Sequence, residues 1–122
     1  MIKESRPHSP QACTASIAAV KDALYVLNGK WKLPLIVALL NGPKRFKEIQ
    51  RSLSEITPKV LSKELRELEL NGFLERKVFN TIPVAITYEL TPYSESLDGV
   101  IESLRLWGEQ HRLHLVEKRR LE

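Results

Sequence analysis

Two short helices followed by two strands fill residues 45–90, and this order constrains the fold of the chain more than any other feature. The first helix is predicted for residues 45–53, where apolar positions recur at helical spacing: Phe46, Ile49 and Leu53. A three-residue link leads to Thr57-Pro58, which is typical of a helix start because threonine caps well and proline fits the first helical position. The second helix runs to Leu70, ends at Asn71-Gly72 and directs three leucines toward one core: Leu61, Leu65 and Leu68.

The spacing of apolar residues changes after Gly72. Residues 74–79 are strand-like, and residues 84–90 alternate between apolar and other side chains, as in a half-buried strand. The tetrapeptide Asn80-Thr81-Ile82-Pro83 supplies the turn, so a hairpin directly follows the helix pair. The predicted fold class is therefore α+β and mostly helical: a winged helix-turn-helix with a two-stranded wing.

Further helices are predicted on both sides of this segment. Ser16 is the expected N-cap of a first helix that stops at Asn28-Gly29, a second runs from Trp31 to Leu40, and a last one runs from Thr91-Pro92 to about Arg120. Residues 1–12 show no periodicity and are expected to form a flexible arm. Residues 13–122 are expected to form a single domain, since a chain of 122 residues can bury one substantial core.

Basic charge is concentrated in the middle of the chain. Residues 29–82 carry 11 Lys and Arg against 6 Asp and Glu, while the rest carries 8 against 9, within a net charge of +4. A basic centre in a neutral frame is typical of a nucleic-acid-binding module, although a solvated basic face would give the same count. Charge alone leaves both interpretations open.

Several protein classes are disfavoured by composition. No apolar stretch reaches 18 residues, which argues against a membrane span, and residues 1–15 lack the apolar run of a secretory signal. The single cysteine, Cys13, makes no internal disulfide and no four-cysteine zinc site. We therefore expect a cytoplasmic protein without a cofactor.

The second helix of the motif presents a polar stripe opposite its leucines, at i, i+3, i+4 and i+7: Lys59, Ser62, Lys63 and Arg66. The major groove of B-DNA, about 12 Å wide, admits one α-helix, and such side chains reach phosphates or guanine O6 and N7. Glu64, Glu67 and Glu69 lie to the flanks and back, where they would repel phosphate if turned inward. A solvated amphipathic face is the alternative, but the helix pair, the hairpin and the basic centre together favour duplex DNA.

The hairpin adds Arg76 and Lys77 near its start and Asn80 and Thr81 at its tip. Such a wing lies along the phosphate backbone or enters the minor groove. The alternative for the two basic residues is protection of an exposed sheet edge.

Motifs in the same order resemble those of the HxlR family of bacterial transcription regulators, over about Cys13 to Trp107. They are Cys13, Gly29-Lys30-Trp31-Lys32, Arg45-Phe46-Lys47-Glu48-Ile49, Ile56-Thr57-Pro58-Lys59-Val60-Leu61-Ser62, Leu65-Arg66-Glu67-Leu68-Glu69, Gly72, Pro83, Tyr88-Glu89-Leu90-Thr91 and Leu97. The resemblance implies a homodimeric winged-helix DNA-binding protein whose first and last helices build the dimer. Ser94 is a departure, since the family usually has glycine there.

When the family's roles are carried over position by position, the resemblance implies that the polar stripe is the recognition face and that residues 76–83 are the wing. Arg45 and Lys47 open the first helix of the motif, where such proteins often hold the phosphate backbone, and Thr57 completes the predicted DNA-binding set. For Lys30 and Lys32, phosphate contact and a solvated turn both remain open. The expected partners are double-stranded DNA with an inverted repeat and a second copy of the chain.

The predicted dimer interface combines apolar positions of the two terminal helices: Ile17, Val20, Leu24, Leu27, Leu97, Val100, Ile101, Leu104 and Trp107. Cys13 is expected just before the first of these helices, where the positive end of a helix dipole favours a thiolate. Some HxlR-like regulators sense oxidants or electrophiles through a cysteine at this position, so the resemblance supports a sensor. A small residue packed at a helix start is the alternative.

Enzyme chemistry is not expected. His111 and His114 are spaced to share a metal ion, but they continue the 3-4 spacing of Leu97, Val100, Leu104 and Trp107, which favours packing. For Trp31 and Trp107, core or dimer packing is favoured over a ligand cage. The alternative function is a winged helix that contacts protein or RNA, although the polar stripe has no aromatic residue on which single-stranded RNA would stack.

Overall fold

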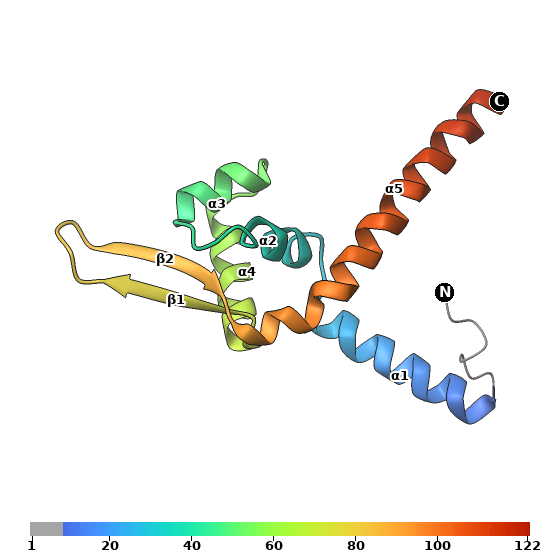
Figure 1. The fold of residues 1–122 in the computed structure, drawn as a ribbon, viewed down its shortest axis with the longest axis horizontal. Helices are drawn as coiled ribbons and strands as arrows, with labels where there is room; N and C mark the ends of the chain where they lie inside the picture. Colours follow the sequence, from blue (N-terminus) through green and yellow to red (C-terminus); the bar gives the residue numbers. More distant parts are fainter. Residues whose placement is uncertain (1–8) are drawn as a thin grey trace.

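The computed structural model describes residues 9–122, and its helices and strands follow the predicted order (Figure 1). Their bounds are α1 Pro10–Val26, α2 Lys32–Ala38, α3 Phe46–Leu53, α4 Pro58–Leu70, β1 Leu74–Phe79, β2 Ala85–Leu90, the 3₁₀ helix η1 Pro92–Leu97 and α5 Asp98–Leu121. The predicted class, a mostly helical winged helix-turn-helix, is confirmed. Most of the predicted arm, residues 1–8, lies outside the described residues.

One hydrophobic core joins α2, α3, α4, the start of the wing and η1. The three leucines of α4 are buried in it, as their spacing predicts, and Ile49 of α3 joins them. Its full buried set is Leu35, Ile36, Leu39, Ile49, Ile56, Leu61, Leu65, Leu68, Phe73, Leu74 and Leu97. Because one side of α4 is fixed in this core, its opposite side necessarily faces solvent.

Local hydrogen bonds define the helix-turn-helix. The Thr57 hydroxyl oxygen accepts from the amide of Val60 at 3.2 Å, and Pro58 occupies the first turn of α4, so the predicted cap and start are confirmed. At the start of α3 the Arg45 amide donates to the Glu48 carboxylate at 2.8 Å. The connecting turn is tight, since Ser54 and Glu55 have φ values of 56° and 46°, a region that favours glycine.

The wing is tied to the helix-turn-helix at its base. Its strands pair antiparallel from Leu74 opposite Leu90 to Phe79 opposite Ala85. Lys44, just before α3, exchanges two backbone hydrogen bonds with Tyr88 of β2, at 3.0 and 2.8 Å. These bonds fix the direction of the wing relative to α3 and α4.

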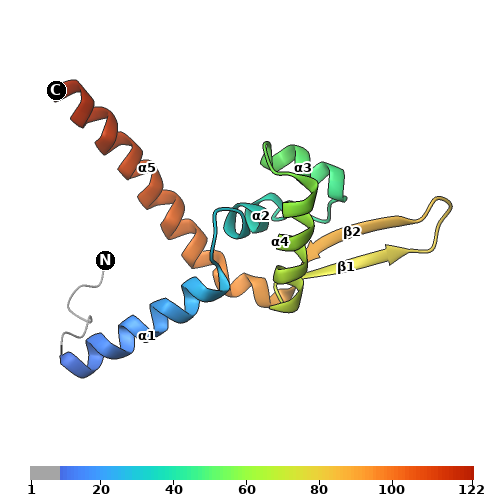
Figure 2. The ribbon, with the colours of Figure 1, turned by 180° about the vertical axis from the view of Figure 1, so that it is seen from behind.

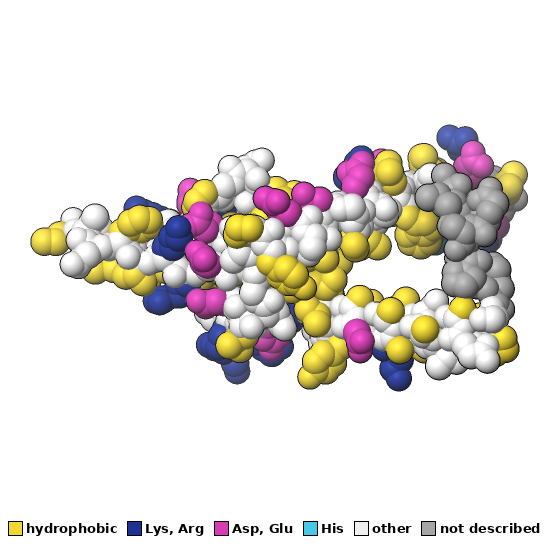
Figure 3. Space-filling view, turned by 60° about the horizontal axis from the view of Figure 1, so that its bottom comes forward, with side chains coloured by type: hydrophobic (Ala, Val, Ile, Leu, Met, Phe, Trp, Pro, Cys, Tyr) yellow, Lys and Arg dark blue, Asp and Glu magenta, His cyan; other side chains and the backbone are white. Residues whose placement is uncertain are grey.

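The terminal helices α1 and α5 project from the core on the side away from the wing (Figures 1 and 2). Neither helix contains a buried residue. Hydrophobic side chains line both of them in the space-filling view (Figure 3). No helix within residues 9–122 is both long and apolar enough to cross a membrane.

Two predicted helix starts are wrong. Ser16 is not a cap: α1 begins at Pro10, and the Ser9 hydroxyl accepts from the amide of Ala12 at 3.1 Å, so residues 10–12 of the expected arm are helical. The last helix is preceded by η1, in which Ser94 is buried and its hydroxyl donates to the Thr91 carbonyl at 2.7 Å. The serine that departs from the family pattern therefore stabilises this turn.

Candidate nucleic-acid interface

The outward side of α4 is polar and accessible. Lys59, Ser62 and Arg66 are exposed, while the three leucines on the opposite side are buried. Within the described part of the chain, neither Lys59 nor Arg66 has an acidic partner within ion-pair distance. Two cations and a hydroxyl are thus available along one side of the helix.

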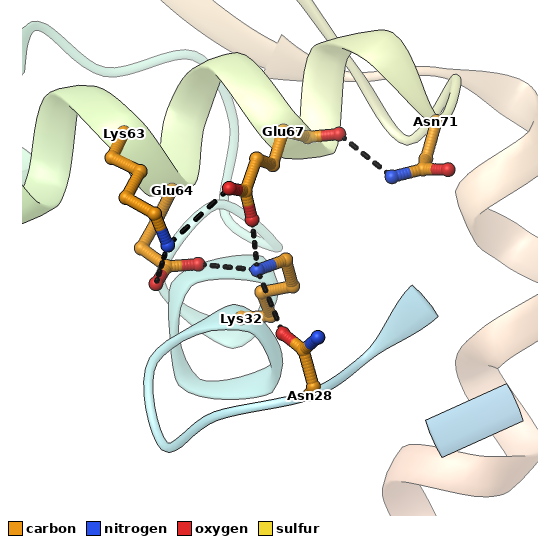
Figure 4. A network of polar contacts seen from close by, with 6 residues as sticks. All are labelled: Asn28, Lys32, Lys63, Glu64, Glu67 and Asn71. Carbon is orange, nitrogen blue, oxygen red and sulfur yellow. Dashed lines mark hydrogen bonds and ion pairs between the residues drawn. The ribbon is translucent and has the colours of Figure 1, made fainter. Parts of the chain in front are cut away.

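Lys63, the remaining residue of the predicted stripe, is paired with neighbours on its own helix (Figure 4). Its ammonium lies 3.3 Å from Oε2 of Glu67 and 4.0 Å from Oε2 of Glu64. Its side chain is still 61% exposed. The charge of Lys63 is therefore offset in the free protein, unlike that of Arg66.

Lys32 is neither solvated nor open to phosphate, so both sequence-based interpretations of it are wrong. It is only 2% exposed, and its ammonium reaches two carboxylates of α4. Its Nζ donates to Oε1 of Glu64 and Oε1 of Glu67, both at 2.6 Å, and to Oδ1 of Asn28 at 3.2 Å (Figure 4). Desolvation by burial acts to lower the pKa of Lys32, but the hydrogen bonds to the two carboxylates outweigh it and raise the pKa.

The base of the wing adjoins the outward side of α4. Ser62, Arg66 and Glu69 line one hollow together with Arg76 and Tyr88 of the wing. The fold thus brings Arg76, a predicted wing contact, next to two residues of the predicted recognition face. Lys59, at the other end of α4, does not line this hollow.

The two basic wing residues are not equivalent. Lys77 lies 2.5 Å from Oε1 of Glu89 on the opposite strand, and this hydrogen bond raises the pKa of Lys77. Arg76 has no ion-pair partner in residues 9–122. Of the two basic residues, Arg76 is therefore the one whose charge is unpaired in residues 9–122.

The outer half of the wing carries no charge. Asn80 and Thr81 are exposed at its tip, where the Thr81 hydroxyl donates to the carbonyl of Pro83 at 2.7 Å. Exposed apolar side chains flank them: Val78, Phe79, Ile82 and Val84. In Figure 1 this tip is the part of the wing farthest from α4, so Asn80 and Thr81 do not gather with the α4 residues.

A third group of basic residues lies on α3 and at its N-cap. Arg45 and Lys47 are exposed, as predicted, and line a hollow beside Ile86 of the wing. Arg51 of α3 lines the same hollow, although the sequence analysis did not single it out. Its spacing of four residues from Lys47 was the signal, because positions i and i+4 share one side of a helix.

The predicted dimer residues divide into two groups. Leu97 belongs to the core of the single chain, so its assignment to an interface is wrong: the residue ends η1, which packs against that core. Leu27 and Ile101 are partly buried against the same core. The other six are exposed: Ile17, Val20, Leu24, Val100, Leu104 and Trp107.

The remaining candidates lie on the projecting helices. Cys13 is exposed at the end of the first turn of α1, rather than before the helix. His111 stacks on Trp107 with ring centroids 4.8 Å apart, and no cluster of three metal-binding side chains occurs among residues 9–122. The packing role predicted for Trp31 is confirmed, since it lies against the core.

A helix-turn-helix with an accessible polar recognition helix, followed by a wing whose base adjoins that helix, defines a DNA-binding protein of the winged helix-turn-helix class. Residues 26–115 match the model of the HxlR-like helix-turn-helix family. The chain belongs to this family, as the motifs of the sequence predict. The curated relatives that it matches are named as HTH-type transcriptional regulators.

Individual relatives agree with this assignment. The chain is 41% identical over 93 residues to the uncharacterized HTH-type transcriptional regulator YtcD of Bacillus subtilis (strain 168), covering 76% of this chain and 74% of YtcD. It is similar to the reduced form of the redox regulator HypR, with a TM-score of 0.76 and 35% identity over 81% of this chain and 98% of HypR. It is also similar to diamide-treated YodB from B. subtilis, with a TM-score of 0.64 and 33% identity over 84% and 94% of the two chains.

Proposed function

We propose that the protein is a sequence-specific transcription regulator that binds an inverted repeat in duplex DNA as a homodimer. The observation that carries this proposal is the outward side of α4, where Lys59, Ser62 and Arg66 face solvent opposite a buried leucine face. In a two-fold dimer two such helices would enter successive major grooves, about 34 Å apart. Because the proposed partner is chromosomal DNA, we propose that the protein acts in the cytoplasm.

Selection of bound sequences from random duplex DNA tests this function. We expect an inverted repeat whose half-sites lie about one helical turn apart. Arg66→Ala is expected to weaken binding to the selected site by about 1–3 kcal/mol if the guanidinium reads a base. The matched control is Arg112→Ala on α5, an exposed arginine on the helix that projects away from the wing.

Two results would contradict the proposal. Unchanged affinity of Arg66→Ala for the selected site would show that α4 docks differently. Preference for single strands, or for a protein, would favour the alternative role of the winged helix in RNA or protein contact.

The homodimer is supported by apolar surface that the single chain leaves uncovered. Large apolar side chains of α1 and α5 are exposed. The exposed apolar surface also includes a groove between α2 and α5, which is lined in part by Val37, Leu40 and Leu104. Exposed apolar patches of this kind mark interaction sites. A second copy of the chain supplies matching apolar helices, and a two-fold pair explains a palindromic operator.

We also propose that DNA binding responds to thiol oxidation through Cys13. The thiol is exposed on α1, one of the proposed dimer helices, and the similar structures include a redox regulator and a diamide-treated protein. Diamide removes one hydrogen from each of two thiols, so two copies of Cys13 would form an intersubunit disulfide. Such a bond would change the spacing of the two recognition helices.

The test is operator binding before and after diamide treatment, together with non-reducing electrophoresis. We expect treatment to change the affinity of the wild type and to leave Cys13→Ser unaffected. Equal responses of the two proteins would make Cys13 a structural residue.

A further inference from the structure

Two lysines and two glutamates form one cluster of charges between α2 and α4 (Figure 4). Lys32 holds one oxygen of each carboxylate, Oε1 of Glu64 and Oε1 of Glu67, at 2.6 Å. The second oxygens of both carboxylates face Lys63, at 4.0 and 3.3 Å. The four formal charges cancel, so the cluster as a whole presents no net charge to an approaching phosphate.

The two lysines differ in their access to solvent. Lys32 is 2% exposed and lies under α4, whereas Lys63 is 61% exposed on the outward side of that helix. An exposed ion pair of this kind contributes little to stability, so a well-aligned acceptor can replace Glu67 as the partner of Lys63. Lys32 cannot make this exchange, because its ammonium is enclosed by Asn28 and the two carboxylates.

Glu67 stays charged and in place when Lys63 leaves. The hydrogen bond from Lys32, followed by that from Lys63, lowers the pKa of Glu67, so its carboxylate is ionised at neutral pH. Glu67 is also partly exposed, with 36% of its side chain accessible. Its carboxylate therefore remains in place as the partner to which Lys63 returns when no aligned acceptor is present.

We propose that Glu67 is a specificity-determining residue of α4. Its carboxylate holds Lys63 away from DNA until an aligned operator provides another acceptor for the Lys63 ammonium. This inference rests on the proposed function. Non-specific binding depends on phosphate charge, and a lysine that is already neutralised adds little to it. In the aligned complex, Lys63 moves to a DNA acceptor while Lys32 retains Glu67, so the operator gains a contact that random DNA lacks.

The direct test is Glu67→Gln in the full-length protein, with binding measured on random-sequence and operator duplexes at several salt concentrations. Glutamine keeps an oxygen for Lys32 but no longer holds Lys63 by charge. We expect affinity for random duplex to rise about fivefold at 0.15 M salt and the log–log salt slope to steepen by about 0.9, the value of one added phosphate contact. Operator affinity is expected to change less, so the ratio of operator to random affinity falls.

The matched control is Glu55→Gln, which makes the same charge change in the turn just before α4. Glu55 is exposed and makes no ion pair in the part of the chain that the structure describes. It is expected to raise random-duplex affinity less than Glu67→Gln does. Equal rises in the two variants would mean that net charge alone acts, and the proposal would be overturned.

Lys63→Gln tests whether Glu67 acts through Lys63. Alone, it is expected to weaken operator binding more than random-duplex binding. In the Lys63→Gln background, adding Glu67→Gln is expected to change random-duplex affinity much less than it does in the wild type. A full fivefold rise in that background would show that Glu67 acts by its own charge, which would overturn the proposal.

Lys63→Gln also keeps the proposal testable if Glu67→Gln does not fold, as circular dichroism would show. Equal losses of operator and random-duplex affinity in Lys63→Gln would then overturn it. Failure of the proposed function gives a different result: the wild type itself would select no duplex sequence. A wild type that selects an operator, with an unchanged affinity ratio in Glu67→Gln, overturns only the present proposal.

Discussion

Lys32 is a buried lysine whose loss is expected to destabilise the protein. Within residues 9–122, its ammonium is the one cation that reaches Oε1 of the buried Glu64. Lys32→Met would leave that carboxylate buried without its hydrogen-bonded partner. We expect the free energy of unfolding to fall by about 3–5 kcal/mol, the usual effect of breaking a buried pair, as measured by urea denaturation.

Lys30→Met is the matched control for this prediction. Lys30 lies two residues earlier, is exposed and places its ammonium 5.0 Å from the centre of the Trp31 ring. Its loss is expected to change the free energy of unfolding by about 0.5–1 kcal/mol, the range for an exposed cation–π contact. Equal effects at the two positions would show that the buried network contributes nothing particular.

The turn between α3 and α4 contains a residue that glycine would replace with a gain in stability. Ser54 has φ 56° and ψ 162°, a region reached almost only by glycine. We expect Ser54→Gly to raise the free energy of unfolding by about 1 kcal/mol, since relief of strain exceeds the added chain entropy. Ser52→Gly, inside α3, is expected to lower it by a similar amount, and urea denaturation of both variants would show whether the signs differ.

At the scale of elements, the two basic residues near the base of the wing are expected to contribute differently to DNA binding. Arg76 has no ion-pair partner within residues 9–122, whereas Lys77 is paired with Glu89 at 2.5 Å. We expect Arg76→Gln to reduce the log–log salt slope of DNA binding by about one unit and to weaken all duplex sequences alike. Lys77→Gln is expected to change the slope less. The same slope for Arg76→Gln and wild type would indicate that Arg76 only protects a sheet edge.

Helix bounds could be predicted from the sequence for some helices and not for others. The bounds of α4 were predicted because Thr57-Pro58 and Asn71-Gly72 mark both ends, and its leucine spacing identified the outward side. The start of α1 was missed although Ser9-Pro10 repeats the same cap signal, because no apolar periodicity accompanies it at that point. Local signals therefore sufficed where the cap and the apolar period agreed.

Contacts between distant residues account for what the sequence did not show. The partner of Lys32, Glu64, lies 32 residues away on another helix, so nothing near Lys32 in the sequence distinguishes it from a solvated lysine. By contrast, the pairing of Lys63 with Glu67 follows the i, i+4 rule and was predictable from spacing. The burial of Leu97 depends on η1, which the sequence analysis took for the beginning of a continuous helix.

At the scale of the whole molecule, the candidate DNA-binding elements and the apolar helices lie at opposite ends. The wing and α3 and α4 occupy one end, while α1 and α5 extend from the other (Figures 1 and 2). Neither projecting helix buries a residue in the single chain, although both carry exposed large apolar side chains. With this arrangement the polar side of α4 would stay free for DNA in the proposed homodimer, because the apolar helices at the opposite end would contact the second copy.

Leu104→Glu tests this association. Leu104 is exposed on α5 and lines the groove that α5 forms with α2, so in a dimer the new carboxylate would be buried without a partner. An unpaired buried charge costs about 3 kcal/mol or more, which corresponds to a dissociation constant raised by about two powers of ten. Sedimentation is therefore expected to show monomers, and affinity for the inverted repeat should fall toward that of a single half-site. Leu113→Glu is the matched control, because Leu113 is also exposed on α5 but lies about half a helical turn around from Leu104. A dimer that survives Leu104→Glu as well as it survives Leu113→Glu would place the contact between copies on a different surface.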